Sequence, residues 1–402
     1  LGVLYSWSVI GGAIEKAGWG WSQYERSLPY SAACLVFCLV MVPAGRLQDR
    51  FGPRIVAACG GILVGAGMVL AALTTSPAGY VIGFGFLTGA GIGFGYASAT
   101  PPAVKWFPPE KTGMVAGIVV SGFGLASVYV APLAKWLSDG YGLQGMMMTL
   151  GVAFLIVVVG LAQLLRAPHR ALQFMQGLGP VGEARAAKKQ APPAKRDFSP
   201  LQMLKTPGFY LMWFMYACGA GAGLMVISVA QKIGKARVGL LAVVALGIGN
   251  GAGRILAGMI SDKIGRKATV FIFLVLQAVV VGLLSLYARG TVAFGGELAI
   301  VVISALVGAN YGSNLSLFPS ITKDFYGLKH FGMNYGLVFT SWGVGGFVMA
   351  QMAAKVYDRT QSFKFAFYGS VVLLVLAAIM TMFLRPPKPP DAPAEAVAAL
   401  KS

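Results

Sequence analysis

The chain alternates long apolar stretches with short polar connections over almost its whole length. A run of about twenty mainly apolar residues is long enough to cross the hydrocarbon core of a bilayer as a helix. We predict twelve such spans, at residues 1–14, 28–48, 55–74, 78–99, 113–134, 144–165, 208–230, 238–260, 268–288, 296–318, 332–354 and 364–384. Because the chain begins inside an apolar run, we expect the first helix to lack its first turns. The pattern predicts an all-α polytopic membrane protein.

Two charged turns repeat about half a chain apart. The segment GRLQDRFGPR at 45–54 parallels GMISDKIGRK at 258–267, and GMVAGIVVSGFG at 113–124 parallels GMNYGLVFTSWG at 332–343. The repeat predicts two pseudo-symmetric six-helix bundles, at residues 1–165 and 208–385, around a site at the bilayer midplane. The Pro-, Ala- and Lys-rich segment 166–207 is expected to be a solvated cytoplasmic linker, and 386–402 a disordered cytoplasmic tail.

Composition supports a membrane protein over a soluble one. The sequence is 57% hydrophobic and 11% charged, whereas soluble domains carry about 25% charged residues. The net charge of +19 does not indicate nucleic-acid binding, because 21 of the 32 Lys and Arg residues fall in the connections on one side of the membrane. That bias predicts cytoplasmic N- and C-termini in a cytoplasmic (inner) cell membrane.

Arg254 is the one charged side chain that we place well inside a span. A guanidinium is always protonated, is costly at that depth and indicates function. Asn250 lies one turn earlier on the same helix face. Backbone carbonyls or a structural Glu could hold the cation, but no acidic residue lies well inside any predicted span. A visiting carboxylate, bound by the planar guanidinium, fits better.

Glycine strings such as GIGNGAG at 247–253 superficially suggest a dinucleotide site, but they lie inside apolar helices. Their small-xxx-small spacing predicts close helix packing instead. The sequence has no Cys/His cluster, P-loop or nucleophile with a base, so we expect no enzymatic activity, no cofactor and no metal.

The repeated charged turn resembles the signature loop of the major facilitator superfamily. Within it, the phrases WFPPEKTGMVAGIVVSGFG, GRILAGMISDKIGRK and SLFPSITKDFYGLKHFGMNYGLVFTSWG resemble the oxalate/formate antiporter and monocarboxylate transporter group. The resemblance implies an Arg on the eighth helix that binds substrate, which Arg254 matches. Oxalate carriers add a Lys on the eleventh helix, where this chain has Trp342, so one remaining cation favours a monoanion. Animal monocarboxylate carriers have Asp where this chain has Asn250, and a Lys near the position of Val9.

The resemblance also implies which helices line the substrate cavity. The candidate substrate-binding residues are Arg254, Asn250, Tyr5, Tyr96, Tyr311, Asn314, Phe123, Phe339 and Trp342. Phe123 and Trp342 occupy matching places in the repeat. Arg254 and Asn250 are also the candidates for proton coupling. The duplicated turns are expected to act in gating, through Asp49, Arg50, Arg54, Asp262 and Arg266.

We therefore predict a secondary active transporter of small monocarboxylates such as lactate or pyruvate, coupled to a proton by alternating access. Its partners would be the anion, a proton and the lipid bilayer, with a monomer as the functional unit. An organic anion antiporter of the oxalate/formate type is the nearest alternative. A non-transporting membrane receptor or scaffold is the remote one.

Overall fold

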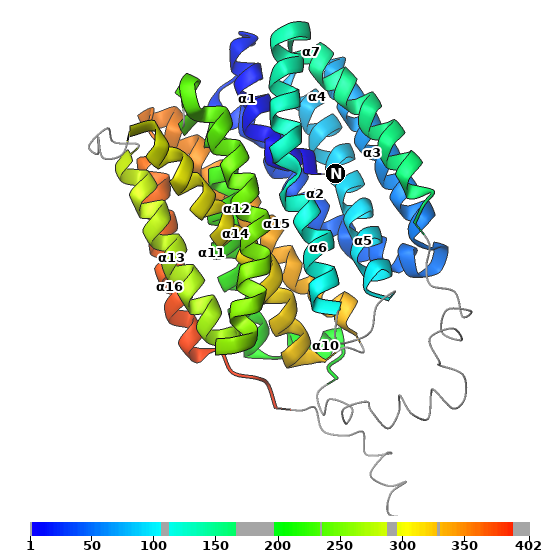
Figure 1. Ribbon diagram of the computed structural model, residues 1–402, viewed down its shortest axis with the longest axis vertical. Helices are drawn as coiled ribbons and strands as arrows, with labels where there is room; N and C mark the ends of the chain where they lie inside the picture. The colour runs from blue at the N-terminus through cyan, green and yellow to red at the C-terminus, as the bar shows by residue number, and fades with distance from the viewer. Residues whose placement is uncertain are drawn as a thin grey trace, which may run out of the picture.

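The helices form two groups that lie side by side (Figure 1). A computed structural model describes residues 2–105, 112–165, 197–233, 235–287, 296–327 and 330–388. These residues are almost entirely helical, and no strand occurs among them, so the predicted all-α class is confirmed. The first half comprises η1 (Gly2–Ser6), α1 (Trp7–Lys16), α2 (Gln23–Phe51), α3 (Pro53–Ala72), α4 (Pro77–Tyr80), η2 (Val81–Thr88), α5 (Gly89–Lys105), α6 (Thr112–Gly124) and α7 (Ala126–Ala162). The second half comprises α10 (Pro200–Leu204), α11 (Pro207–Ile233), α12 (Lys235–Ile264), α13 (Arg266–Tyr287), α14 (Gly296–Tyr326), α15 (Phe331–Thr360), α16 (Lys364–Met380) and η4 (Thr381–Phe383).

Twelve crossing segments can be recognised in the described residues. Ten helices there are long and apolar enough to span a membrane. The longest, Ile118–Ala162, covers most of the predicted spans 113–134 and 144–165, because the chain turns back at Gly142, whose φ of 70° is left-handed. The short first helix, η1 followed by α1, supplies the remaining segment. Large apolar side chains such as Ile156 and Leu164 stay exposed on the outside, as lipid contact requires.

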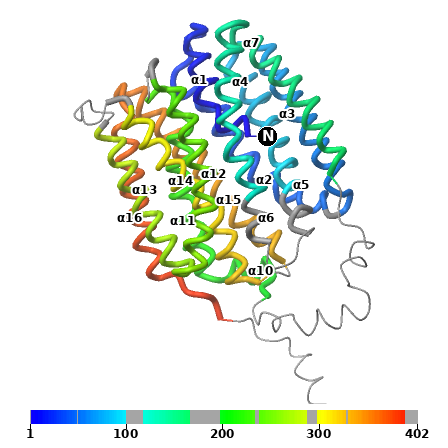
Figure 2. The backbone as a smooth tube through the Cα atoms, viewed as in Figure 1, coloured from blue at the N-terminus to red at the C-terminus, as the bar shows by residue number. Residues whose placement is uncertain are grey.

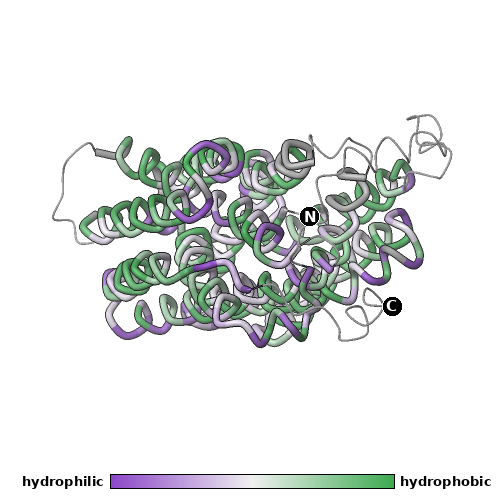
Figure 3. The backbone as a smooth tube through the Cα atoms, turned by 90° about the horizontal axis from the view of Figure 1, so that it is seen from below, coloured by the Kyte–Doolittle hydropathy of each residue, from purple (hydrophilic) through white to green (hydrophobic). Residues whose placement is uncertain are grey.

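The two halves meet along several helix pairs. Helix α2 packs against α15, and α6 and α7 pack against α12. We call the side where α16 ends and the chain leaves the bundle the tail side, at the bottom of Figure 2, and the opposite side the far side. A view from the tail side shows apolar residues along both groups of helices (Figure 3).

Glycines allow helices α12 and α14 to pack with their backbones in contact. A Cβ added at Gly249 or Gly253 would overlap the carbonyl oxygen of Ala305 or Ala309 on α14. A Cβ added at Gly312 of α14 would likewise overlap the Asn250 carbonyl. The GIGNGAG segment is therefore a packing stripe, and it fixes α12 against α14 at the depth of Asn250 and Arg254.

Ionic and capping contacts join the two halves on the far side. Glu15 of α1 pairs with Arg26 of α2 (2.5 Å) and with Lys232 of α11 (3.2 Å). Asp358 of α15 accepts hydrogen bonds from the backbone N–H groups of Gln23 and Tyr24, both at 2.8 Å. A carboxylate at a helix N-terminus is stabilised by the helix dipole. These contacts hold the far side closed between the halves.

The end of the predicted linker is folded. Residues 166–196 lie outside the described residues, but α10 follows, and Ser199 and Gln202 form a reciprocal capping box at its start. Phe198 is buried; its N–H donates to the Tyr326 carbonyl, and its own carbonyl accepts from Asn334 Nδ2. The last part of the expected connector 166–207 is therefore ordered, because an apolar side chain and a helix cap anchor it. Of the predicted tail, residues 389–402 lie outside the described part.

Candidate functional site

Arg254 is buried near the middle of α12, with a relative exposure of 2%. Its Nε donates to Asn250 Oδ1 (3.1 Å), its Nη1 to the Val120 carbonyl of α6 (2.5 Å) and its Nη2 to the Tyr5 hydroxyl (3.3 Å). All three acceptors are neutral. One of them is a backbone carbonyl, the kind of partner that the sequence left open as an alternative to a visiting carboxylate. In the part of the chain that the structure describes, the cation has no ion-pair partner.

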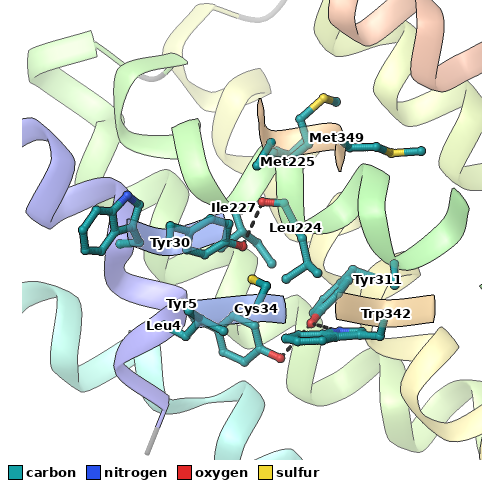
Figure 4. Close-up of a cluster of buried hydrophobic side chains, with 14 of the residues drawn as sticks. Leu4, Tyr5, Tyr30, Cys34, Leu224, Met225, Ile227, Tyr311, Trp342 and Met349 are labelled. Carbon is teal, nitrogen blue, oxygen red and sulfur yellow. Dashed lines mark hydrogen bonds between the residues drawn. The ribbon is translucent and has the colours of Figure 1, made fainter. Parts of the chain in front are cut away.

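A line of hydroxyl groups continues from Arg254 into the second half. The hydroxyls of Tyr5 and Tyr311 are 2.8 Å apart, and Trp342 Nε1 donates to the Tyr311 hydroxyl at 2.9 Å (Figure 4). Tyr5 comes from η1, Tyr311 from α14 and Trp342 from α15. Three predicted site residues from distant parts of the sequence therefore lie in one hydrogen-bonded line with Arg254.

The line leaves hydrogen-bond donors unused. A guanidinium has five N–H groups, and three of those on Arg254 donate to described protein atoms. The Tyr5 hydroxyl accepts from Arg254, and the Tyr311 hydroxyl accepts from Trp342. One of these two hydroxyls also donates to the other. The hydrogen of the second hydroxyl therefore has no acceptor among these four residues. Asn250 Nδ2 is buried without a partner in the described residues. These donors suit the oxygens of a carboxylate, which when ionised only accept hydrogen bonds.

Aromatic rings pack beside the hydroxyl line. Phe123 of α6 meets Tyr5 edge-on, with ring centroids 5.0 Å apart, and meets Tyr96 of α5 at 5.5 Å. Phe339 stacks on Trp342 at 5.1 Å and lies 6.0 Å from Tyr96. The Tyr96 hydroxyl has no hydrogen bond to the described residues, so its ring is the part that contributes here. Four predicted aromatic residues thus form one apolar wall.

Phe37 of α2 lies at the centre of this wall, and the sequence did not single it out. Its ring centroid is 5.1 Å from that of Trp342, 5.5 Å from those of Tyr96 and Phe339, and 6.0 Å from that of Phe123. Nothing in its sequence context distinguishes it from the other apolar residues of α2.

Gly124 brings the backbone of α6 close to the guanidinium. A Cβ added there would lie 3.2 Å from Asn250 Cγ and 3.3 Å from Arg254 Nε. Helix α6 ends at this residue, and α7 begins after Leu125. Gly124 is the last residue of the repeated segment 113–124. That repeat is the sequence signal that could have identified Gly124 as a residue of the site.

Asn314 does not join the hydroxyl line in the described structure. Its Nδ2 donates to the Asn310 carbonyl on its own helix (2.9 Å). Its amide group packs directly against Gly219 of α11, where a larger residue would clash with it. It is buried and supports the packing of α14 on α11. Its role in substrate binding stays a prediction.

The duplicated turns share one backbone geometry. Gly52 and Gly265 link α2 to α3 and α12 to α13 with φ values of 83° and 89°, the left-handed region that glycine adopts readily. In the second turn, Arg266 pairs with Asp262 (2.6 Å) and with Asp324 of α14 (3.1 Å).

The first turn presents cations outward. Arg54 is exposed, and the Arg50 guanidinium lies 5.3 Å from the centroid of the neighbouring Phe51 ring. The side chain of Asp49 lies outside the described part. Gating by these turns stays a prediction.

Two groups of membrane-length apolar helices, with the buried Arg254 of one group bonded to α6 and η1 of the other, are typical of a helical membrane carrier of the two-bundle kind. The sequence model of the Major Facilitator Superfamily matches residues 1–235 and 220–401. The chain belongs to this superfamily and is a membrane transporter, not an enzyme.

Similar proteins support the same family. The chain is 28% identical over 392 residues to the oxalate:formate antiporter of Oxalobacter formigenes, covering 96% of this chain and 88% of that one. It is 25% identical over 360 residues to monocarboxylate transporter 13 of Bos taurus, covering 87% and 80%. Among solved structures, the inward open xylose transporter XylE from E. coli has a TM-score of 0.72 at 15% identity, with 99% and 97% covered. That last similarity concerns the fold alone.

Proposed function

We propose that the protein transports a small monocarboxylate of the lactate or pyruvate kind by alternating access. The observation that supports this is the buried Arg254, whose three hydrogen bonds go to neutral groups and whose remaining N–H groups face no acidic side chain in the described residues. A carboxylate would supply the missing negative charge. Asn250 and one hydroxyl of the Tyr5–Tyr311 pair would supply further donors, and the aromatic wall would hold the carbon chain.

A proton would accompany the anion. A monoanion and a proton cross together without moving net charge, and the described part of the site holds one cation and no carboxylate to change that balance. We propose that the proton is held at the substrate–Arg254 pair, with Asn250 as its neighbour. We further propose that a monomer carries out transport in the cytoplasmic membrane, with both termini and the tail side in the cytoplasm, since basic connections are retained there.

The test is uptake of radiolabelled lactate into proteoliposomes, with and without an inward proton gradient, for the native chain, Arg254→Ala and Arg254→Lys. Removing one partner of a buried charge interaction costs about 2–5 kcal/mol, so we expect uptake by either variant to fall by about two orders of magnitude. Lys364→Gln, which removes a cation at the far-side end of α16, is the matched control and should retain native uptake. Native-like uptake by Arg254→Ala would refute the proposal.

Anion exchange is the second candidate, because the Oxalobacter formigenes relative is an oxalate:formate antiporter. Trp342 stands where the resemblance expects a Lys, which argues for a monoanion in this chain. Uptake that is the same with and without the proton gradient, and that requires an anion inside the vesicles, would establish exchange instead. Binding of lactate with no flux under either condition would favour a receptor.

A further inference from the structure

A groove runs along the outer face of α15, away from the Arg254 site. Its volume is about 440 Å³, and it is lined by Phe347, Val348, Gln351, Met352, Lys355, Val356 and Arg359. The lining residues recur at helical spacing, so they form one stripe on α15. The stripe ends on the far side, where α15 stops at Thr360.

The groove is apolar along its length and cationic at one end. Lys355 and Arg359 lie one turn apart and are exposed, and neither forms an ion pair within the described residues. Lys355 Nζ lies 5.1 Å from the centroid of the Tyr24 ring of α2, which holds the amine at the edge of the groove. The connections on this side carry fewer basic residues than those on the tail side, so the positive-inside bias does not account for this pair.

The dimensions match one lipid in one leaflet. From Phe347 to Arg359 the helix rises about 18 Å, and half of the hydrocarbon core is about 15 Å thick. The two cations therefore lie at headgroup depth when the apolar stripe lies beside an acyl chain. A small soluble anion would use the cations and leave the apolar stripe unfilled.

We propose that this groove binds one anionic phospholipid, with its phosphate at Lys355 and Arg359 and an acyl chain along Val356, Met352 and Phe347. The proposal does not depend on the transported substrate. The floor of the groove is a contact between the halves, because Gln351 Nε2 donates to Ser27 Oγ (3.0 Å) and Ser31 Oγ (2.8 Å) of α2. The lipid therefore covers the junction of the halves on the far side.

A second groove provides an internal comparison. It has a volume of about 570 Å³ and is lined by Ser22, Tyr24, Glu25, Leu28, Pro77, Ala78, Val81 and Ile82. It lies near the same membrane surface, but its charged residue is Glu25, and none of its lining residues is basic. An anionic headgroup is repelled there, so selectivity for anionic lipid comes from the α15 groove.

The experiment is native mass spectrometry of the full chain in detergent, titrated with dioleoyl-phosphatidylglycerol or dioleoyl-phosphatidylcholine. We expect the native chain to bind one phosphatidylglycerol in preference to phosphatidylcholine. Lys355→Gln and Arg359→Gln should each weaken phosphatidylglycerol binding about fivefold, the equivalent of about 1 kcal/mol, and leave phosphatidylcholine binding unchanged. Lys364→Gln, a cation at the same membrane surface but outside the groove, is the matched control.

The outcomes decide the proposal. Equal binding of the two lipids by the native chain, or equal weakening by Lys364→Gln, would overturn it. A dimer peak that the groove variants remove, without lipid selectivity, would assign the groove to a second copy of the chain and also overturn it. Thermal unfolding of each variant, expected within about 2 °C of native, separates lost binding from lost folding. Because the readout is lipid mass, the result is independent of whether lactate is transported.

Discussion

Arg254 shows how a residue that is costly inside a membrane is retained. Its guanidinium is buried, yet each hydrogen bond that it makes goes to a neutral acceptor supplied by a different element, namely α12, α6 and η1. A neutral shell solvates the cation without cancelling its charge. That is the electrostatic state that favours binding of an anion.

At this scale, we predict that Gly124→Ala impairs substrate binding. The added Cβ would lie within 3.3 Å of Asn250 and Arg254 and displace them by a few tenths of an ångström. We expect the apparent affinity for lactate to fall by about tenfold, because small misplacements of binding groups are costly. The measurement is the concentration dependence of lactate uptake.

Gly122→Ala is the matched control, because a Cβ there meets nothing within 4 Å. Both variants add one methyl group to the same helix. If the two variants have the same apparent affinity for lactate, the close approach of Gly124 to the guanidinium does not affect substrate binding.

Helix α12 is the element that connects the site to the fold. One face of it carries Asn250 and Arg254, and Gly249 and Gly253 lie against the backbone of α14, the helix that carries Tyr311. Helix packing in membranes relies on such small residues, because lipid offers no hydrophobic drive for association.

We predict that Gly253→Ala destabilises the protein, because the methyl group would overlap the Ala309 carbonyl. Overpacking of this kind costs about 1–3 kcal/mol. We expect a melting temperature several degrees below native, measured by thermal unfolding in detergent. Gly258→Ala on the same helix meets nothing within 4 Å and should melt like the native chain. Equal melting of the two variants would contradict the packing role of Gly253.

On the scale of the whole molecule, the far side is closed by contacts that cross between the halves. Glu15 reaches Lys232, and Asp358 caps α2 from the other half. Burial alone would raise the pKa of the Glu15 carboxyl, but Arg26 and Lys232 lower it below its ordinary value. The Glu15 ion pairs therefore stabilise the closed far side fully at pH values above the ordinary pKa of the carboxyl. This stabilisation is lost only as the pH falls through the lowered pKa.

We predict that Glu15→Gln together with Asp358→Asn opens the far side. The measurement is electron–electron distance spectroscopy between spin labels at Tyr141→Cys and Phe365→Cys, with Cys59 replaced by Ser. We expect a longer distance in the double variant. In the otherwise native chain, the distance should stay constant between pH 7 and pH 5, because Glu15 remains ionised there.

Lys16→Gln is the matched control, because it breaks an ion pair with Asp139 inside the first half (3.5 Å). It removes a far-side charge without touching the junction. The role of the junction contacts is refuted if Lys16→Gln lengthens the distance as much as the double variant does.

The sequence by itself determined the number of crossings, the repeat and the central cation. Apolar runs and buried charge have physical consequences in a bilayer that do not depend on which helix packs against which. It also selected Tyr5, Tyr96 and Tyr311, since hydroxyl groups inside apolar spans need partners, and Trp342, which occupies the place of Phe123 in the repeat.

Only the tertiary structure decided how these groups combine. It joined Tyr5, Tyr311 and Trp342 to Arg254 in one line and turned Asn314 back to its own helix. It also placed Phe37 among the aromatic rings and the Gly124 backbone against the guanidinium. The reason is that helical periodicity fixes which residues share a face, whereas the neighbour that each face meets depends on contacts between segments hundreds of residues apart.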